Sequence, residues 1–375
     1  MKIRIKPKKL ILPVLNALAV AGIIFTTIAG HSAARSQSYN FAYERWKGIS
    51  EEDFGQASCF FSDEAKLTTK SIRSLRGQVI KCLKDAACDI EKEEPFADAY
   101  SAIVGEAKVK CDISRSSKAQ ITAVGGDFFL FHDFDLISGA YFSEKDTMQD
   151  GAVIDKSLAW ALYGSTDIVG MYIYIDGVKC YISGVIEDPT DKTEKKCAGK
   201  MPKAYVTYDT ASSMKKYASS GDPMSGLADF DKITCYECIL PEPVEKLTIN
   251  SVKSIFADTY GENVSIVDNM RRFTPKTRAK AFRKLSESVI RNDGIRLPYW
   301  ENTSRMYEFK ATVLYGLRRY MFIIPILTLL WLAFRGIVAY NRNKAKLKQR
   351  IINFADKKLR KRRADVSTSE KGITS

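Results

Sequence analysis

The sequence from Leu10 to Gly30, LILPVLNALAVAGIIFTTIAG, contains 21 residues and no charged side chain. A second apolar stretch, Tyr320–Tyr340 (YMFIIPILTLLWLAFRGIVAY), contains a single charge at Arg335. About 20 apolar residues in a helix cross the ~30 Å hydrocarbon core of a bilayer. We therefore predict two transmembrane helices, at residues 10–30 and 320–340, with Arg335 close enough to the end of its helix to reach the headgroups.

Basic residues flank both apolar stretches on the side away from the centre of the chain. Residues 1–9 carry five Lys and Arg, and residues 341–375 carry twelve against three acidic residues. Because Lys and Arg are enriched on cytoplasmic flanks, both termini are expected in the cytoplasm and residues 31–319 outside a plasma membrane. A cleaved signal peptide is the alternative for the first stretch, which is longer than the usual apolar region and lacks a clean A-x-A site.

The charge between the two tails is balanced, because residues 10–340 contain 41 basic and 41 acidic side chains. A nucleic-acid-binding protein carries its excess positive charge on a folded face. The sequence therefore argues against a nucleic-acid partner. Its 45% hydrophobic content provides enough apolar material for a folded core.

All eight cysteines lie in the segment predicted to face the outside, where disulfides persist. We predict structural disulfides, with Cys180 paired to Cys197 and Cys235 paired to Cys238 because they are close in sequence. A zinc site and a redox-active Cys235–Cys238 pair remain as alternatives, although one C-x-x-C without nearby histidines is poor metal spacing. The other candidates for disulfides are Cys59, Cys82, Cys88 and Cys111.

The outer segment shows an α/β pattern on both sides of a β-rich centre. Residues 66–84 have apolar side chains at helical spacing, and Asp176-Gly177 is a strong signal for a two-residue hairpin turn. The fold class expected is α+β: two transmembrane helices flank an extracytoplasmic domain made of a split α/β (βαβ) unit with an inserted β-rich unit. The predicted segments are the N-terminal tail 1–9, helix 10–30, first α/β half 31–120, inserted unit 121–225, second α/β half with juxtamembrane helix 226–319, helix 320–340 and basic tail 341–375.

Individual elements are also expected within this plan. Ser32–Gln56 is predicted to be a stalk or loop, and Phe128–Phe131 belongs to the β-rich run. Helices are predicted at Lys156–Leu162, at Lys276–Ile290 and at Glu301–Arg319, the last continuing into the second apolar stretch.

Motifs for catalysis are missing from the sequence. It contains no G-x-x-x-x-G-K-[ST] phosphate-binding loop, no G-x-S-x-G elbow and no H-E-x-x-H pair. Of the two histidines, His31 lies at the end of the first apolar stretch, and a structural role is favoured for His132. We predict a protein that is not an enzyme and that uses no cofactor or metal.

The centre of the chain carries an ordered series of short motifs. It resembles the MacB-like periplasmic core domain of ABC transporter permeases, in the wider FtsX-like superfamily. The segments that carry the resemblance are VGGDFF at 124–129, LISGAYFS at 136–143, AVI at 152–154, LA and LYG at 158–164, DIVG at 167–170, YIYI at 172–175, YISGV at 181–185 and KAYVTY at 203–208.

This resemblance implies a membrane protein that dimerises and works with a cytoplasmic ATPase to move substrates or to relay signals across the membrane. It implies a bacterial plasma membrane as the location. Such permeases have three helices after the outer domain, whereas this sequence shows one apolar stretch there. The resemblance therefore implies a two-span variant that pairs with a fuller permease subunit and an ABC ATPase, as a homodimer or heterodimer.

The basic tail contains an amphipathic helical pattern over Asn341–Arg363. Such helices bind anionic inner-leaflet lipids, and each cation near the surface contributes ~1 kcal/mol. Docking onto an ATPase or a partner permease and a disordered tail are the alternatives. The candidate lipid- or partner-binding residues are Lys344, Lys348, Arg350, Ile351, Phe354, Leu359 and Arg360.

Three functional hypotheses follow from the sequence. The leading one is a non-enzymatic membrane subunit of an ABC-type transport or signalling complex. The second is a membrane-anchored protein that binds or senses a ligand at the cell surface without transport. The third is a membrane-tethered thiol oxidoreductase that uses Cys235 and Cys238.

Overall fold

The computed structural model describes residues 7–48, 50–91, 94–218, 231–284 and 294–371. The chain divides into two compact units. One consists of residues 28–316, and the other contains residues 1–27 together with residues 317–375. The first is the folded outer unit, and the second is helical. Each unit is described by itself below.

The helical unit contains most of α1 (Pro7–Arg35) and all of α12 (Ile323–Lys371). In the described part of the chain, two helical stretches, Ile11–Arg35 and Tyr299–Lys344, have the length and composition of membrane-crossing helices. The amide of Asn16 donates a hydrogen bond to the hydroxyl of Thr328, with 3.0 Å between the two atoms. The predicted apolar stretches thus lie within helices, and their crossing of a membrane stays a prediction.

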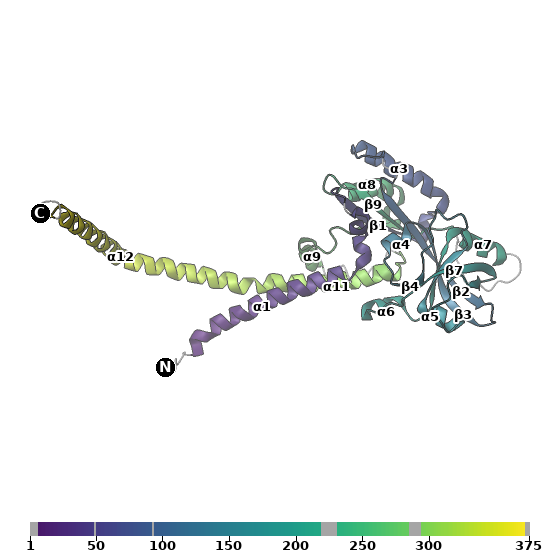
Figure 1. Ribbon diagram of the computed structural model, residues 1–375, viewed down its shortest axis with the longest axis horizontal. Coiled ribbons are helices and arrows are strands. Elements are labelled where there is room, and N and C mark those ends of the chain that lie inside the picture. The colour runs from purple at the N-terminus through teal and green to yellow at the C-terminus, as the bar shows by residue number, and fades with distance from the viewer. Residues whose placement is uncertain (1–6, 49, 92–93, 219–230, 285–293, 372–375) are drawn as a thin grey trace. The chain divides into compact units, whose positions relative to one another are not determined.

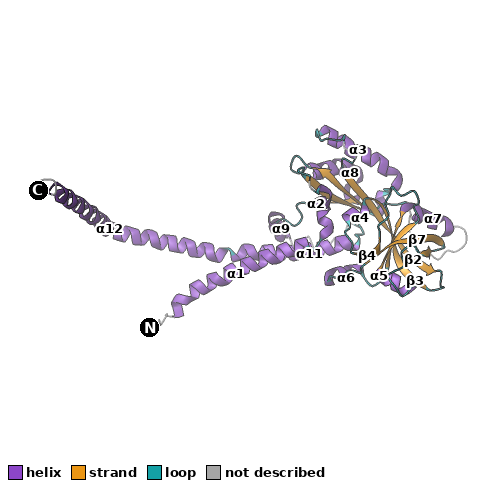
Figure 2. Ribbon diagram, in the orientation of Figure 1, coloured by secondary structure: helices purple, strands orange, loops and turns teal. Residues whose placement is uncertain are grey.

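The outer unit is a mixed α/β domain built on one sheet, which has ten strands in the described part of the chain (Figures 1 and 2). The order is β10-β1-β9-β2-β3-β8-β5-β7-β4, and β6 pairs with β2 and β7. The strands are β1 (Phe54–Phe61), β2 (Ala97–Cys111), β3 (Ser116–Gly126), β4 (Leu136–Gly139), β5 (Gly151–Asp155), β6 (Tyr172–Ile175), β7 (Val178–Ile186), β8 (Lys203–Thr207), β9 (Cys235–Pro241) and β10 (Val264–Asp268).

Distant parts of the sequence meet in this sheet. Strand β1 lies between β9 and β10 and is antiparallel to both, so the first and the last strands of the outer unit are neighbours. The strands from β3 to β8 form the other side. The 15-residue strand β2 connects the two sides, and its pairing with β3 shifts register between Ile103 and Gly105. The two sides belong to one continuous sheet, which does not by itself divide the chain into subdomains. The predicted boundaries at 120/121 and 225/226 therefore stay a prediction.

Each face of the sheet is covered by its own helices and its own hydrophobic core. On one face, α3 (Ile72–Asp85), α5 (Lys156–Leu162), α7 (Tyr208–Ala218) and α8 (Leu247–Tyr260) contribute buried residues such as Val79 and Phe256. Figure 1 shows α3 and α8 together over β1 and β9. The burial of one such apolar side chain contributes about 1.5–3 kcal/mol.

The opposite face is richer in aromatic side chains. It is covered by short elements: η1 (Ser38–Phe41), α2 (Ala42–Lys47), α4 (Phe128–Phe131) and the first turn of α11 (Tyr299–Met321). Phe128, Phe131, Tyr205, Tyr299 and Trp300 are buried together there. This face contains the candidate site.

Several predicted elements are confirmed. The helix at Lys156–Leu162 has the predicted bounds. The predicted hairpin is formed by β6 and β7, and both Asp176 and Gly177 have positive φ (45° and 91°), as a type I′ turn requires. The helix predicted at residues 66–84 is shorter, because α3 begins at Ile72 after a 3-10 turn.

Other predictions at this level need correction. Ser32–Gln56 is not a loop: α1 continues to Arg35, and η1 and α2 follow. Phe128–Phe131 forms a helical turn, because its Phe128 and Phe131 point to the same core. The helix predicted at Lys276–Ile290 is present as α9 (Pro275–Ala281) and η5 (Phe282–Lys284), and its residues 285–290 lie outside the described residues.

The predicted disulfides are wrong for this structure: all eight cysteines are described, and all are free. Cys235 and Cys238 are three residues apart on β9, so they point to opposite faces of the strand. Cys180 packs in the core that includes Val79, whereas Cys197 packs against the aromatic core on the other face. Cys59, Cys82, Cys88 and Cys111 are also unpaired.

The same burial argues against a redox function for the cysteines of β9. Burial raises the pKa of the thiols of Cys235 and Cys238, so the reactive thiolate is disfavoured. For metals, the described residues contain no cluster of three His, Cys, Asp or Glu side chains that could hold an ion.

Candidate functional site

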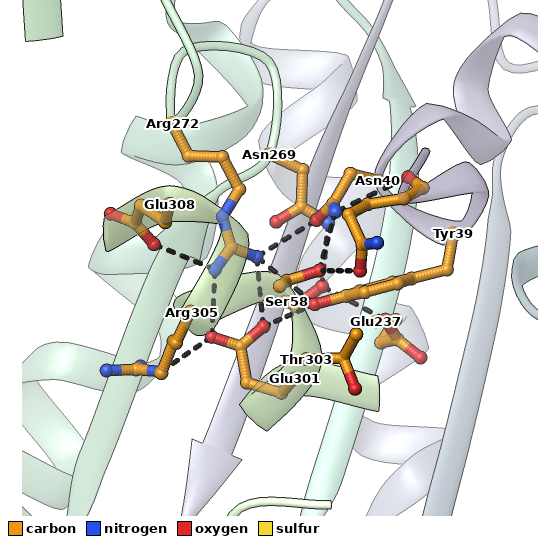
Figure 3. Close-up of polar contacts among 12 residues, drawn as sticks. Tyr39, Asn40, Ser58, Glu237, Asn269, Arg272, Glu301, Thr303, Arg305 and Glu308 are labelled. Carbon is orange, nitrogen blue, oxygen red and sulfur yellow. Dashed lines mark hydrogen bonds and ion pairs between the residues drawn. The ribbon is translucent and has the colours of Figure 1, made fainter. Parts of the chain in front are cut away.

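The outer unit contains a buried ionic cluster centred on Arg272, which we call the Arg272 cluster. It consists of Arg272, Glu301, Glu308, Tyr39 and Asn40 (Figure 3). The Arg272 guanidinium is 3% exposed and the Glu301 carboxylate is fully buried. Two charges placed so deeply are tolerated only when they are paired and hydrogen-bonded.

The pairing of Arg272 with Glu301 is bidentate. One terminal nitrogen donates to Glu301 Oε2 at 2.9 Å and the other donates to Glu301 Oε1 at 3.0 Å. The same two nitrogens also donate to Asn40 Oδ1 at 2.9 Å, to the Tyr39 hydroxyl at 3.1 Å and to Glu308 Oε2 at 3.0 Å. The planar guanidinium suits this geometry, which a lysine ammonium could not reproduce.

Three separate elements supply these side chains. Arg272 lies in the turn after β10, and Tyr39 and Asn40 lie on η1. Glu301 and Glu308 are seven residues apart on α11, which places them on the same face of that helix. Figure 3 shows the side chains from these elements converging on one guanidinium.

The cluster extends along α11 through further polar contacts. Arg305 donates to Glu301 Oε1 at 2.7 Å, and Arg278 forms an ion pair with Glu308. Asn40 donates to the hydroxyl of Ser304 at 2.9 Å. The segment that follows α1 and the first turns of α11 are therefore fixed to the same cluster.

The electrostatics of the cluster favour its charged state. Burial raises the pKa of the Glu301 carboxyl, but the charge of Arg272 and its hydrogen bonds outweigh that effect, so the pKa lies below its ordinary value. For Arg272, burial acts to lower the pKa, and the charge of Glu301 outweighs it. Each partner thus keeps the other ionised.

A second buried network lies beside the Arg272 cluster. The Nε2 atom of His132 is 2.7 Å from Glu237 Oε2, and the hydroxyl of Ser58 donates to Glu237 Oε1 at 3.0 Å. Asn269 in turn donates to Ser58 at 2.9 Å. This network connects the end of α4, β9, β1 and the turn after β10.

The two central side chains of the second network are almost completely buried. His132 is 2% exposed and Glu237 is 1% exposed, and the His132 ring lies between Phe128 and Trp300. The pair is almost fully buried, and His132 also lines an acidic cavity of the outer unit. The structural role of His132 stays a prediction.

The Arg272 cluster could not be found from sequence spacing. Arg272 is 233 residues from Tyr39 and 29 residues from Glu301. The local sequence around each is ordinary: Glu301 begins a predicted helix, and Arg272 is one of two adjacent arginines. Nothing in such a pattern distinguishes a buried charge from a solvated one.

The predicted lipid- or partner-binding residues lie on α12, which continues without a break to Lys371. Lys344 and Phe354 are exposed. The side chains of Lys348, Arg350, Ile351, Leu359 and Arg360 lie outside the described residues. Their role in binding stays a prediction.

Comparison with protein families gives a match to a known domain family. Residues 17–228 match the model of the MacB-like periplasmic core domain. The matched range contains the end of the first apolar helix and the strands β1 to β8. It also contains every motif on which the sequence resemblance was based.

Two curated relatives are the macrolide export ATP-binding/permease proteins MacB of Haemophilus ducreyi and Pasteurella multocida. The first is 31% identical over 97 residues, which is 25% of this chain and 14% of the relative. The second is 29% identical over 100 residues, which is 26% of this chain and 15% of the relative. The matched part therefore spans about a seventh of the length of these proteins.

Two solved structures are also similar. The extracellular domain of the noncanonic ABC-type transporter YknZ from Gram-positive bacteria is 14% identical, with a TM-score of 0.36 over 58% of this chain and 100% of that domain. The periplasmic region of MacB from Actinobacillus actinomycetemcomitans is 14% identical, with a TM-score of 0.36 over 67% of this chain and 99% of that region.

Proposed function

The chain belongs to the MacB-like periplasmic core domain family, and from this premise we propose that it is a non-enzymatic membrane subunit of an ABC-type transport or signalling complex. It has two apolar helices and an outer domain, and its sequence has no nucleotide-binding loop. A cytoplasmic ABC ATPase and a fuller permease subunit are the partners that would supply what this sequence lacks.

The observation that carries this proposal, beyond family membership, is the Arg272 cluster. Two residues separate the end of α1 from η1, and a single residue separates α11 from α12. Arg272 holds both η1 and α11 through buried hydrogen bonds. A shift of the sheet would therefore be transmitted to both segments that lead into the apolar helices, as a coupling subunit requires.

In this proposal both termini lie in the cytoplasm and residues 31–319 lie outside the plasma membrane of a bacterium. The charge distribution supports the orientation, because Lys and Arg are concentrated in the two tails. The basic part of α12 would lie on the anionic inner leaflet or contact the ATPase. The complex would contain this subunit as a homodimer or as a heterodimer with a fuller permease.

Purification of the full chain in mild detergent tests the partnership. We expect an ABC ATPase and a permease subunit to co-purify in stoichiometric amounts. A variant with Lys344, Lys348, Arg350 and Arg360 replaced by Gln separates the two roles of the tail, because loss of the ATPase assigns the tail to that partner. A wild-type chain that elutes without an ATPase contradicts the proposal.

Labelling with a membrane-impermeant thiol reagent on intact cells tests the orientation. The half-buried Cys82, Cys88 and Cys197 are first replaced by Ser, and single cysteines are then introduced at Ser36 or Ser369. We expect modification at position 36, and at position 369 only after the cells are permeabilised. The reverse pattern refutes the proposed topology.

A second candidate function is a membrane-anchored ligand-binding protein without transport. It is favoured by a strongly acidic cavity in the outer unit, lined by Asp155, Asp188 and Glu194 among others. A chain that binds ligand but purifies without any ATPase would support this function over the first.

A further inference from the structure

A cavity of about 320 Å³ that opens to solvent lies beside the Arg272 cluster, within the outer unit. Asp155 lies at the carboxyl end of β5 and Ile186 at that of β7, and both line the cavity. Tyr39 from η1 and Tyr299 and Trp300 from α11 also line it. Its volume falls at the lower end of the range for small-molecule sites, about 300–1,000 Å³.

The lining of this cavity has a large excess of negative charge. Lys203 is its single Lys or Arg side chain. The Lys203 ammonium donates to the carbonyl of Met201 at 3.2 Å and has no carboxylate partner among the described residues. The acidic residues of the lining are Asp133, Asp135, Asp155, Glu187, Asp188 and Glu194.

Internal contacts satisfy only some of these carboxylates. Asp155 accepts from the backbone N–H groups of Leu158 and Lys203, and Glu187 pairs with Lys156 at 3.0 Å. In the described part of the chain, no side-chain hydrogen bond reaches the carboxylates of Glu194 or Asp135. Burial, and after it the charge of a nearby carboxylate, raises the pKa of Asp155 to about 7 and also raises that of Glu194. The negative charge of the cavity is therefore poorly compensated.

The uncharged part of the cavity lining also contains a polar group that makes no hydrogen bond to the described residues. Trp300 is 6% exposed, and its indole N–H has no hydrogen-bond partner among the described residues. A buried donor without an acceptor destabilises the fold, and a bound acceptor atom would remove that cost. Tyr299 and Trp300 add aromatic rings, which attract cations through their faces. The ammonium of Lys203 already lies 5.4 Å from the centre of the Tyr299 ring.

These features specify the chemistry of a ligand. A bare divalent ion is disfavoured, because no three of the described carboxylates are arranged to hold one. We propose that the cavity binds a small organic cation that carries an ammonium or guanidinium group together with an oxygen that accepts from the Trp300 N–H. The cation would lie between the carboxylates and the aromatic rings. This proposal goes beyond the proposed function and holds whether or not an ATPase partner exists.

The test uses the purified full chain in detergent and two matched probes. Nα-acetyl-lysine amide carries one ammonium group, and Nα,Nε-diacetyl-lysine amide keeps its two amides and has a neutral acetamide in place of the ammonium. Calorimetric titration should detect saturable binding of the first probe, with at least tenfold weaker binding of the second. Equal affinities, or no binding of the charged probe at millimolar concentration, overturn the proposal.

Variants locate the binding at this cavity. Glu194→Gln with Asp135→Asn removes two carboxylates that make no described side-chain hydrogen bond, so the fold should be preserved. We expect the affinity of the charged probe to fall about fivefold or more, since a partly exposed ion pair contributes up to ~1 kcal/mol. The matched control, Asp85→Asn with Glu262→Gln, removes two exposed carboxylates outside the cavity lining and should leave the affinity unchanged. An equal loss in both double variants overturns the assignment to this cavity.

Discussion

The Arg272 cluster and the acidic cavity each contain one buried carboxylate, Glu301 and Asp155, and these two groups have opposite electrostatic states. In the cluster, Arg272 holds the pKa of Glu301 below its ordinary value. In the cavity, burial and the charge of Asp188 raise the pKa of Asp155 to about 7. Both regions include residues of η1 and α11, so their difference does not come from position in the fold.

The difference comes from the presence or absence of a matched counter-charge. Glu301 receives two hydrogen bonds from Arg272 and one from Arg305, whereas Asp155 accepts from backbone groups alone. A buried charge that is paired with a counter-charge fixes the structure around it. A buried charge without a counter-charge is available for a ligand. The predictions below test this division.

Replacement of Arg272 by Met should have the largest effect. It leaves Glu301 buried without its main partner, and the removal of one member of a buried pair costs about 3–5 kcal/mol. Thermal unfolding of the full chain in detergent should show a large drop in Tm. Arg35→Met is the control, because Arg35 and its partner Glu44 are both exposed and such a pair should contribute ~1 kcal/mol or less. Equal drops in the two variants would contradict the comparison.

The double replacement Arg272→Met with Glu301→Met should recover part of that loss. An apolar pair of similar volume has no desolvation cost, and such exchanges are often neutral or stabilising by ~1–4 kcal/mol relative to the ion pair. We expect the Tm of the double variant to lie above that of Arg272→Met alone. A double variant that is the less stable of the two would show that the remaining partners, Tyr39 and Arg305, matter more than the charge.

The carboxyl of Asp155 should give a pH dependence of intermediate size. Its pKa is raised on folding, so between about pH 4 and pH 7 the unfolded chain releases a proton that the folded chain retains. Asp155 therefore lowers the stability of the folded state progressively over this range, by up to ~1.4 kcal/mol per pH unit. Tm measured from pH 4 to pH 7 should fall more steeply in the wild type than in Asp155→Asn. Parallel curves would contradict the shift.

The smallest effect is expected for Glu194→Gln. This change removes one of several like charges that face the cavity, so stability at pH 7 should stay within about 0.5 kcal/mol of the wild type or rise. The direction of this stability change distinguishes the two regions, because loss of a charge from the Arg272 cluster should destabilise the domain. A Glu194→Gln variant that loses stability as Arg272→Met does would mean that the cavity is a structural cluster too.

Local features of the fold could be predicted from the sequence, and the site could not. The helix at Lys156–Leu162 and the turn at Asp176-Gly177 depend on neighbouring residues, so periodicity and turn chemistry reveal them. The sequence resemblance to the MacB-like domain is likewise confirmed by the family match.

The site depends on contacts between residues that are far apart in the chain. Arg272 and Tyr39 meet only because β10 pairs with β1 and places the turn after it beside η1. The cysteine prediction failed for a related reason. Cys235 and Cys238 are close in sequence, but an extended strand directs them to opposite faces. In both cases, the distance between two residues in the sequence did not indicate whether their side chains meet in the fold.

Helix α12 has a consequence for the reach of this subunit. Its 49 residues rise about 74 Å, more than twice the thickness of a hydrocarbon core. If residues 320–340 fill that core, the rest of the helix is a rod of about 46 Å. A protein bound at the far end of this helix would lie well away from the lipid surface. A tilt of the helix would displace that end by a distance that grows with the length of the helix.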